Sequence, residues 1–266
     1  MNSSHIIGIF LRHLYVLRHS FFRLLTLFYW TTLELLLWGF ITIWLEGIAR
    51  ADFKLTLATA LLGGMIFWHI FYRGQQAIAI SFLEDVWTRN ILNVFAAPIK
   101  AREFIAGLIL ISIADTIFAI TLLGILAGIF YAFNIWTFGF YIIPFFINVL
   151  VFGWVLGFVT IGLLIRFGQG VEALAWTFPA IFLPLSGVFY PISVLPMIFQ
   201  KIAFFVPTSH LFEGMRLVLT NHIFPLNNVI WASALNLVFL VCSLAFFYWM
   251  IGSARKKGAL SRMVTE

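Results

Sequence analysis

Charged side chains are scarce in this chain. Asp, Glu, Lys and Arg make up only 10% of its 266 residues, hydrophobic residues make up 63%, and the mean hydropathy is +1.06. Soluble globular domains carry about 25% charged residues. The shortage therefore excludes an ordinary soluble domain and predicts a polytopic helical membrane protein.

Potential metal ligands are few and poorly spaced. The single cysteine, Cys242, lies within an apolar run, which excludes a disulfide framework and a cysteine-based metal site. His69, His210 and His222 lack the i,i+3 or i,i+4 spacing that places two ligands on one helix face. No metal site is therefore predicted.

A phosphate-binding loop is missing as well. That loop needs glycine-rich backbone followed by Lys and then Ser or Thr. None of the five lysines is followed by Ser or Thr. We therefore expect this chain to be no enzyme and to hold no cofactor of its own, and any ATP hydrolysis has to come from a partner.

Long apolar runs make up most of the chain. A bilayer core takes about 20 apolar residues per helix, and six runs fit this requirement: residues 24–45, 55–71, 104–131, 138–165, 171–189 and 229–251. The first run is too long for the apolar part of a signal peptide, so we interpret it as a retained anchor. The prediction is an all-α membrane protein with six transmembrane helices within residues 24–252.

Lys and Arg are distributed unevenly between the two sides of these runs. Twelve of them flank one side and four flank the other. The positive-inside rule then predicts that both termini lie on the cytoplasmic side of a cell membrane, such as a bacterial inner membrane. The net charge of +6 is explained by this topology and by contact with anionic lipid. Nucleic-acid binding is not expected, because the basic residues are scattered among short loops.

Both chain ends carry basic residues. In the arm formed by residues 1–23, apolar and basic side chains alternate at helical spacing from residue 6 onward. This pattern predicts an amphipathic interfacial helix on the inner membrane surface, although a simple extension of the first span has the same pattern. Residues 253–266 are predicted to form a basic cytoplasmic tail.

A short polar break, residues 81–97, interrupts the apolar runs. Ser81 and Glu84 match a capping box, and Asp85 and Arg89 have the i,i+4 spacing of a stabilising ion pair. Pro98 follows and should end the helix. We expect a short helix along the cytoplasmic face, which is either a docking element or an interfacial connector without a partner.

The segment 190–222 is apolar but broken by prolines. Pro191, Pro196 and Pro207 prevent one continuous helix, so we expect two short helices, residues 194–206 and 209–220, the second capped by Thr208 or Ser209. Glu213 and Arg216 are spaced for an i,i+3 ion pair. Broken backbone at membrane depth must be buried in protein or face water. The prediction is an outer re-entrant helical hairpin.

A few polar residues fall inside the apolar runs, and they are candidate functional sites by default. They are Glu34, Arg73, Gln75, Gln76 and Asp115. They could line a polar substrate path, or they could form structural hydrogen bonds between helices. An intramembrane enzyme would need a convergent catalytic set, and neither carboxylate has a paired His at useful spacing. A passive channel would need no cytoplasmic docking helix.

Two motifs carry a family resemblance. The stretch SFLEDVWTRNILNVFAAP at residues 81–98, followed by Glu103 and Gly107, resembles the coupling-helix region of type-2 permeases of ATP-binding-cassette (ABC) exporters. PLSGVFYP at residues 184–191, then Leu195-Pro196, VPTSH at residues 206–210 and Arg216, is similar to the fifth span and outer hairpin of the same family.

The resemblance implies a dimer that exports an amphipathic drug, lipid, glycolipid or polysaccharide through its interface. The second subunit would be another copy of the chain or a paralogous permease. Each permease would dock through its coupling helix on a separate ABC ATPase subunit, which would bind ATP and Mg²⁺. The residues implied for docking are Glu84, Asp85, Trp87, Thr88, Arg89 and Asn93, and those implied for an outer gate are Pro191, Pro196, Pro207, Glu213 and Arg216.

The chain departs from the family at two places. It has Thr88-Arg89 and Val206-Pro207 where members often have Glu-Gly or Asn-Pro. The resemblance therefore leaves the subgroup, and with it the substrate, undefined.

Overall fold

The computed structural model describes residues 2–19, 21–48, 54–134, 139–221 and 223–257, and every regular element in these ranges is helical. In chain order the elements are α1 (Ser3–His19), α2 (Phe21–Ile48), α3 (Lys54–Trp87), α4 (Ile91–Ala96), α5 (Ala101–Tyr131), α6 (Ile142–Phe167), η3 (Gly168–Val171), α7 (Leu174–Ser186), η4 (Ile192–Val194), α8 (Met197–Ala203), α9 (Pro207–Asn221) and α10 (Leu226–Lys257). The prediction of an all-α protein is confirmed.

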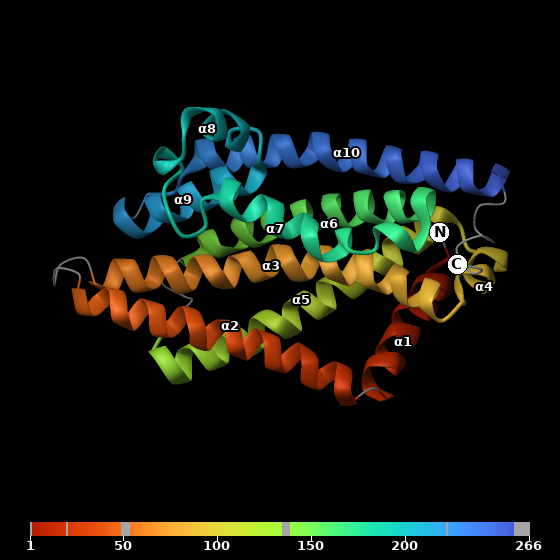
Figure 1. The fold of residues 1–266 in the computed structure, drawn as a ribbon, viewed down its shortest axis with the longest axis horizontal. Helices are drawn as coiled ribbons and strands as arrows, with labels where there is room; N and C mark the ends of the chain where they lie inside the picture. Colours follow the sequence, from red (N-terminus) through yellow and green to blue (C-terminus); the bar gives the residue numbers. More distant parts are fainter. Residues whose placement is uncertain (1, 20, 49–53, 135–138, 222, 258–266) are drawn as a thin grey trace.

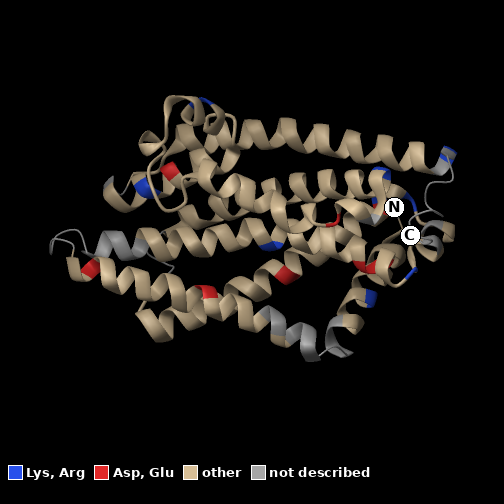
Figure 2. Ribbon diagram, viewed as in Figure 1, with Lys and Arg blue, Asp and Glu red and all other residues tan. Residues whose placement is uncertain are grey.

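The long helices lie side by side and alternate in direction (Figure 1). Helices α2, α3, α5, α6, α7 and α10 run along the bundle, with α1 and α4 at one end and α8 and α9 at the other (Figure 1). The start of α1 and the end of α10 lie at the same end. Charged residues are concentrated at the two ends and are sparse along the middle (Figure 2).

Four helices in the described ranges are long and apolar enough to cross a membrane: Phe28–Ile48, Ala101–Tyr131, Gly139–Phe167 and Leu226–Ala254. A fifth is possible if α8 and α9, which are bent by 96°, form one broken span. The structure therefore indicates a multi-pass membrane protein, and the count of six spans stays a prediction.

The two remaining predicted spans fall on α3 and α7. Helix α3 has 34 residues, which is long enough to cross a membrane, and Arg73, Gln75 and Gln76 lie in its second half. Helix α7 has only 13 residues and contains two prolines. At about 1.5 Å per residue, α7 alone spans about 20 Å, less than the ~30 Å hydrocarbon core.

Small residues bring α3 and α6 together at the centre of the bundle. A Cβ atom on Gly153 would lie 2.7 Å from the Phe71 carbonyl oxygen, and one on Gly157 would lie 2.8 Å from the Ile78 Cβ. Glycine at these two positions lets the helix backbones approach closely, as small residues do in membrane bundles. Phe71 and Ile78 are fully buried in this contact.

The predicted separate helix over residues 81–97 is wrong. Helix α3 continues through Ser81 and ends at Trp87, and α4 begins after a turn. The buried face of α3 continues through Phe82 and Val86, so packing keeps the helix intact where a local capping box predicts a start. The stop at Pro98 is confirmed, because α4 ends at Ala96 and Ala97 is extended.

The terminal segments agree only in outline with the predicted bounds. The arm is a separate helix, α1, that ends at His19, and α2 already begins at Phe21. Helix α10 continues beyond residue 252 to Lys257, so the predicted tail is partly helical. Residues 258–266 lie outside the described part of the chain.

Candidate functional site

The turn between α3 and α4 forms an exposed projection, which we call the elbow (residues 87–93). Trp87 is 44% exposed, and Thr88, Arg89 and Asn93 are exposed as well. The Thr88 hydroxyl donates to the Glu84 carbonyl at 2.6 Å, and the Arg89 backbone has a positive φ of 56° that ends the helix. The predicted docking residues therefore include four outward-facing ones, while Glu84 is partly buried.

Trp87 attaches the elbow to the start of α7. Its Nε1 donates to Glu172 Oε2 at 3.0 Å, and its ring stacks on Trp176 with a centroid distance of 6.5 Å and an interplanar angle of 15°. A hydrogen bond and a stacked ring pair restrain both ends of the indole. The elbow is therefore held against α7.

Asp85 lies behind the elbow and is only 4% exposed. Its carboxylate accepts from both terminal nitrogens of Arg12, with Nη2 2.8 Å from Oδ2, and from Asn90 Nδ2 at 3.1 Å. The predicted ion pair between Asp85 and Arg89 is replaced by this contact, because Arg89 lies in the turn and not on the helix. Asp85 is thus an internal link and not a surface contact.

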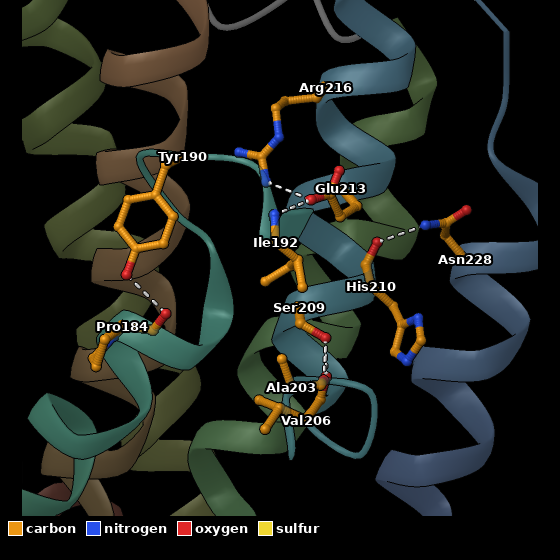
Figure 3. Close-up of polar contacts among 10 residues, drawn as sticks. All are labelled: Pro184, Tyr190, Ile192, Ala203, Val206, Ser209, His210, Glu213, Arg216 and Asn228. Atoms are coloured by element: carbon orange, nitrogen blue, oxygen red, sulfur yellow. Dashed lines mark hydrogen bonds and ion pairs between the residues drawn. The ribbon is translucent and has the colours of Figure 1, made fainter. Parts of the chain in front are cut away.

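The hairpin predicted over residues 190–222 contains two short helices, α8 and α9, although its bounds and cap differ from those predicted (Figure 1). Pro207 is the first residue of α9, a position that suits proline because no N–H is needed there. Ser209 therefore lies inside the first turn, and its hydroxyl donates back to the carbonyls of Ala203 and Val206 (Figure 3). This satisfies backbone groups that the break leaves free.

Glu213 ties the hairpin together. Its Oε1 accepts from Arg216 Nη2 at 3.2 Å, which confirms the predicted i,i+3 pair, and from the Ile192 backbone N–H at 2.6 Å (Figure 3). Ile192 opens η4, directly after Pro191, and Pro196 precedes α8. One carboxylate therefore connects the proline-rich loop to α9.

Neighbouring helices fix the hairpin from both sides. The Tyr190 hydroxyl donates to the Pro184 carbonyl at 2.8 Å, at the end of α7 (Figure 3). Asn228 Nδ2 in α10 donates to the His210 carbonyl of α9 at 3.2 Å (Figure 3). The hairpin is thus a packed unit at the end of the bundle opposite the elbow (Figure 1).

The polar residues inside the apolar runs connect different helices. Nε2 of His69 lies 3.0 Å from Oε2 of Glu34, Nε2 of His13 lies 3.2 Å from Oδ2 of Asp115, Arg73 Nη2 donates to Thr31 Oγ1 at 3.0 Å, and Gln75 Nε2 donates to Thr160 Oγ1 at 3.3 Å. Gln76 lies partly buried on α3. No histidine lies at useful sequence spacing from either carboxylate, but the fold brings one to each of them from another helix.

These contacts support a structural role for most of the group. Arg73 and Gln75 nevertheless each keep one buried polar atom without a partner, Nε and Oε1. The Glu34 side chain is 48% exposed beside His69. A polar path along α2 and α3 therefore stays a prediction for these residues.

An apolar groove lies between α6, α7, α10 and the hairpin. Its volume is about 520 Å³, and Phe152, Phe182, Val206, Phe239 and Cys242 are among the residues that line it. The sequence did not indicate this groove, because its wall combines side chains from four separate elements. Cys242 is exposed on that wall.

Sequence reasoning missed the residues that hold α1 and the elbow in place. Arg12, His5, His13, Glu103 and Glu172 all make contacts to distant parts of the chain. One signal was available: His5, Arg12 and His13 have the i, i+7, i+8 spacing of one helix face. Their acidic partners could not be identified from spacing.

Within the described ranges, no three His, Cys, Asp or Glu residues are grouped so that they could hold a metal ion. His69 and His210 contact other groups, and His222 lies outside those ranges.

No protein-family model matches this sequence, and no curated protein sequence is significantly similar to it.

Proposed function

We propose that this chain is the permease subunit of an ATP-driven ABC exporter. It would move an amphipathic substrate, such as a drug, lipid, glycolipid or polysaccharide, out of the cytoplasm or the inner leaflet. Two copies, or this chain and a paralogous permease, would form the pathway at their interface. Each would dock through the elbow on a separate ATPase subunit that binds ATP and Mg²⁺.

The exposed elbow is the observation that carries this proposal. It presents Trp87, Thr88, Arg89 and Asn93 to the outside at the end where α1 begins and α10 ends. Asp85 restrains it from behind through Asn90, and Glu172 restrains it from the side. A restrained polar and aromatic projection is suited to bind a partner subunit, because Trp and Arg are among the side chains that most often dominate the binding energy of protein interfaces.

The alternatives of a passive channel and an intramembrane enzyme have weaker support. Passive conduction through a channel requires no docking element outside the spans, so it does not account for the restrained elbow. In the part of the chain that the structure describes, the pairs His13–Asp115 and His69–Glu34 have no hydrogen bond to a serine, threonine or cysteine nucleophile. A nucleophile within reach of such a pair is the usual requirement for covalent catalysis.

Co-purification with an ATP-hydrolysing subunit tests the proposal. The tagged full chain should retain such a subunit in mild detergent, with ATP hydrolysis as the readout. Trp87→Ala combined with Arg89→Glu should reduce its retention by at least about tenfold, since loss of one aromatic anchor costs about 2 kcal/mol.

Arg102→Glu is the matched control for this experiment. Arg102 is an exposed basic residue in the first turn of α5, at the same end of the bundle as the elbow. This variant should retain the subunit as well as the unaltered chain does. Equal retention by the elbow variant, with an unchanged gel-filtration profile, would contradict the proposal.

A further inference from the structure

Helix α1 has two distinct faces. One face is apolar and exposed, and it is formed by Ile7, Leu11, Leu14 and Tyr15. The other face lies on the bundle, and it is formed by His5, Ile9, Arg12 and His13. Arg12 and two histidines of the inner face contact the carboxylates of Asp85, Glu103 and Asp115, which belong to α3 and α5.

The Arg12–Asp85 contact is the one that reaches the elbow. The Arg12 guanidinium donates to both carboxylate oxygens of Asp85, Nη1 to Oδ1 and Nη2 to Oδ2. Asn90, which belongs to the elbow, also donates to Oδ1 of Asp85, at 3.1 Å. A bidentate arginine–carboxylate contact fixes the relative orientation of the two side chains as well as their distance. A single buried carboxylate thus connects α1 directly to the turn between α3 and α4.

Other contacts hold α1 independently of Arg12. Glu103 accepts from the Asn2 backbone N–H at 2.8 Å and lies 2.9 Å from His5 Nδ1. Ile9 packs on Gly107, where an added Cβ would lie 2.8 Å from Ile9 Cγ2. Loss of the Arg12 side chain should therefore leave α1 attached to α5 and Trp87 attached to Glu172, while it removes the restraint on the Asn90 side of the elbow.

We propose that Arg12 is a positioning residue that holds the elbow in its docking orientation through Asp85. Without Arg12, Asp85 is a buried carboxylate without a cation, and water has to enter beneath the elbow to solvate it. The hydrogen bonds of the turn then open more often. Only the docking part of this inference rests on the function proposed above.

Hydrogen exchange of the full chain in lipid vesicles tests the positioning without any ATPase. The readout is the exchange rate of amides in residues 88–94, where the N–H groups of Thr88, Arg89 and Val94 bond to backbone carbonyls. Arg12→Met should raise this rate about tenfold and leave peptides of α10 unchanged. Arg102→Met should leave the elbow rate unchanged.

Two further variants separate positioning from a general loss of structure. Arg12→Lys keeps the charge but cannot engage both oxygens in the same way, so it should give an intermediate rate. The exchanged pair Arg12→Asp with Asp85→Arg should bring the elbow rate back toward that of the unaltered chain. Unchanged exchange in Arg12→Met, or equal acceleration by Arg102→Met, would overturn the inference.

Binding of the purified ATPase subunit tests the docking part. Arg12→Met should weaken this binding several-fold relative to Arg102→Met, although Arg12 is not among the exposed elbow residues. Faster elbow exchange with undiminished binding would show that the elbow orientation has no role in docking. If no ATPase binds the unaltered chain, the proposed function fails, and the exchange rates still decide whether Arg12 positions the elbow.

Discussion

At the scale of single residues, polar side chains within this bundle join helices that are far apart in sequence. Asn236 Nδ2 in α10 donates to the Asn148 backbone carbonyl at 2.8 Å and to its Oδ1 at 3.0 Å. Ser233 adds a hydrogen bond to the same Oδ1 at 3.1 Å. Such contacts stabilise membrane bundles because the surrounding lipid offers no hydrogen-bond partner.

Replacement of Asn236 by leucine should lower the free energy of unfolding by about 1 kcal/mol, the usual size of an interhelical hydrogen bond in membrane proteins. Reversible unfolding in mixed micelles would measure this change. Asn227→Leu is the control, because Asn227 is exposed at the start of α10. The hydrogen bonds of Asn236 to Asn148 have no stabilising role if both variants unfold at the same denaturant concentration.

Residue pairs were predictable from the sequence only when they were local. Glu213 and Arg216 lie one helical turn apart, so their ion pair follows from spacing. Arg12 and Asp85 are separated by 73 positions. Spacing favoured Arg89 as the partner of Asp85, and only the tertiary arrangement brings Arg12 to it.

At the scale of elements, prolines predicted breaks better than capping residues predicted starts. Pro98 and Pro207 lie where helices end or begin, because proline has no N–H and restricts the backbone of the residue before it, although Pro179 and Pro184 lie inside α7. Ser81 and Glu84 have the residue types of a cap, yet Ser81 lies buried within α3. A cap motif is a weak local preference, and the continuous apolar face of α3 overrides it.

The hairpin should depend more on Glu213 than on its ion pair with Arg216. Glu213→Ala removes both the partner of Arg216 and the acceptor of the Ile192 N–H, whereas Arg216→Met removes only the ion pair. Limited proteolysis at residues 190–206 should therefore be faster in Glu213→Ala. An i,i+3 ion pair on one helix contributes only about 0.2–0.5 kcal/mol.

The cleavage rates of Glu213→Ala and Arg216→Met have to be compared with each other. Arg216→Met should be cleaved at nearly the rate of the unaltered chain. Equal acceleration in both variants would assign the stability of the hairpin to the ion pair and not to the Ile192 contact.

At the scale of the whole molecule, the sequence predicted a bundle with both termini in the cytoplasm. The start of α1 and the end of α10 lie at the same end of the bundle (Figure 1), and the placement of that end relative to a membrane stays a prediction. The number of spans was less predictable, since α7 has only 13 residues and α8 and α9 are bent by 96°. The position of such short helices in the bundle depends on packing against neighbouring helices, and the hydropathy along the chain does not report this packing.

Cysteine labelling in vesicles tests this topology. In a Cys242→Ser background, cysteines at Asn93 and Lys256 should react with impermeant reagents only from the cytoplasmic side, and one at Ser193 only from outside. All three positions are exposed. Labelling of positions 93 and 193 from the same side would contradict the arrangement.

The uninterrupted length of α3 has a mechanical consequence. At about 1.5 Å per residue its 34 residues extend for about 50 Å, roughly 20 Å more than the hydrocarbon core of a bilayer. The helix is therefore one continuous element that packs on α9 of the hairpin and ends at the elbow. Because no break lies between these two contacts, a tilt of α3 would move the elbow and the α9 contact together.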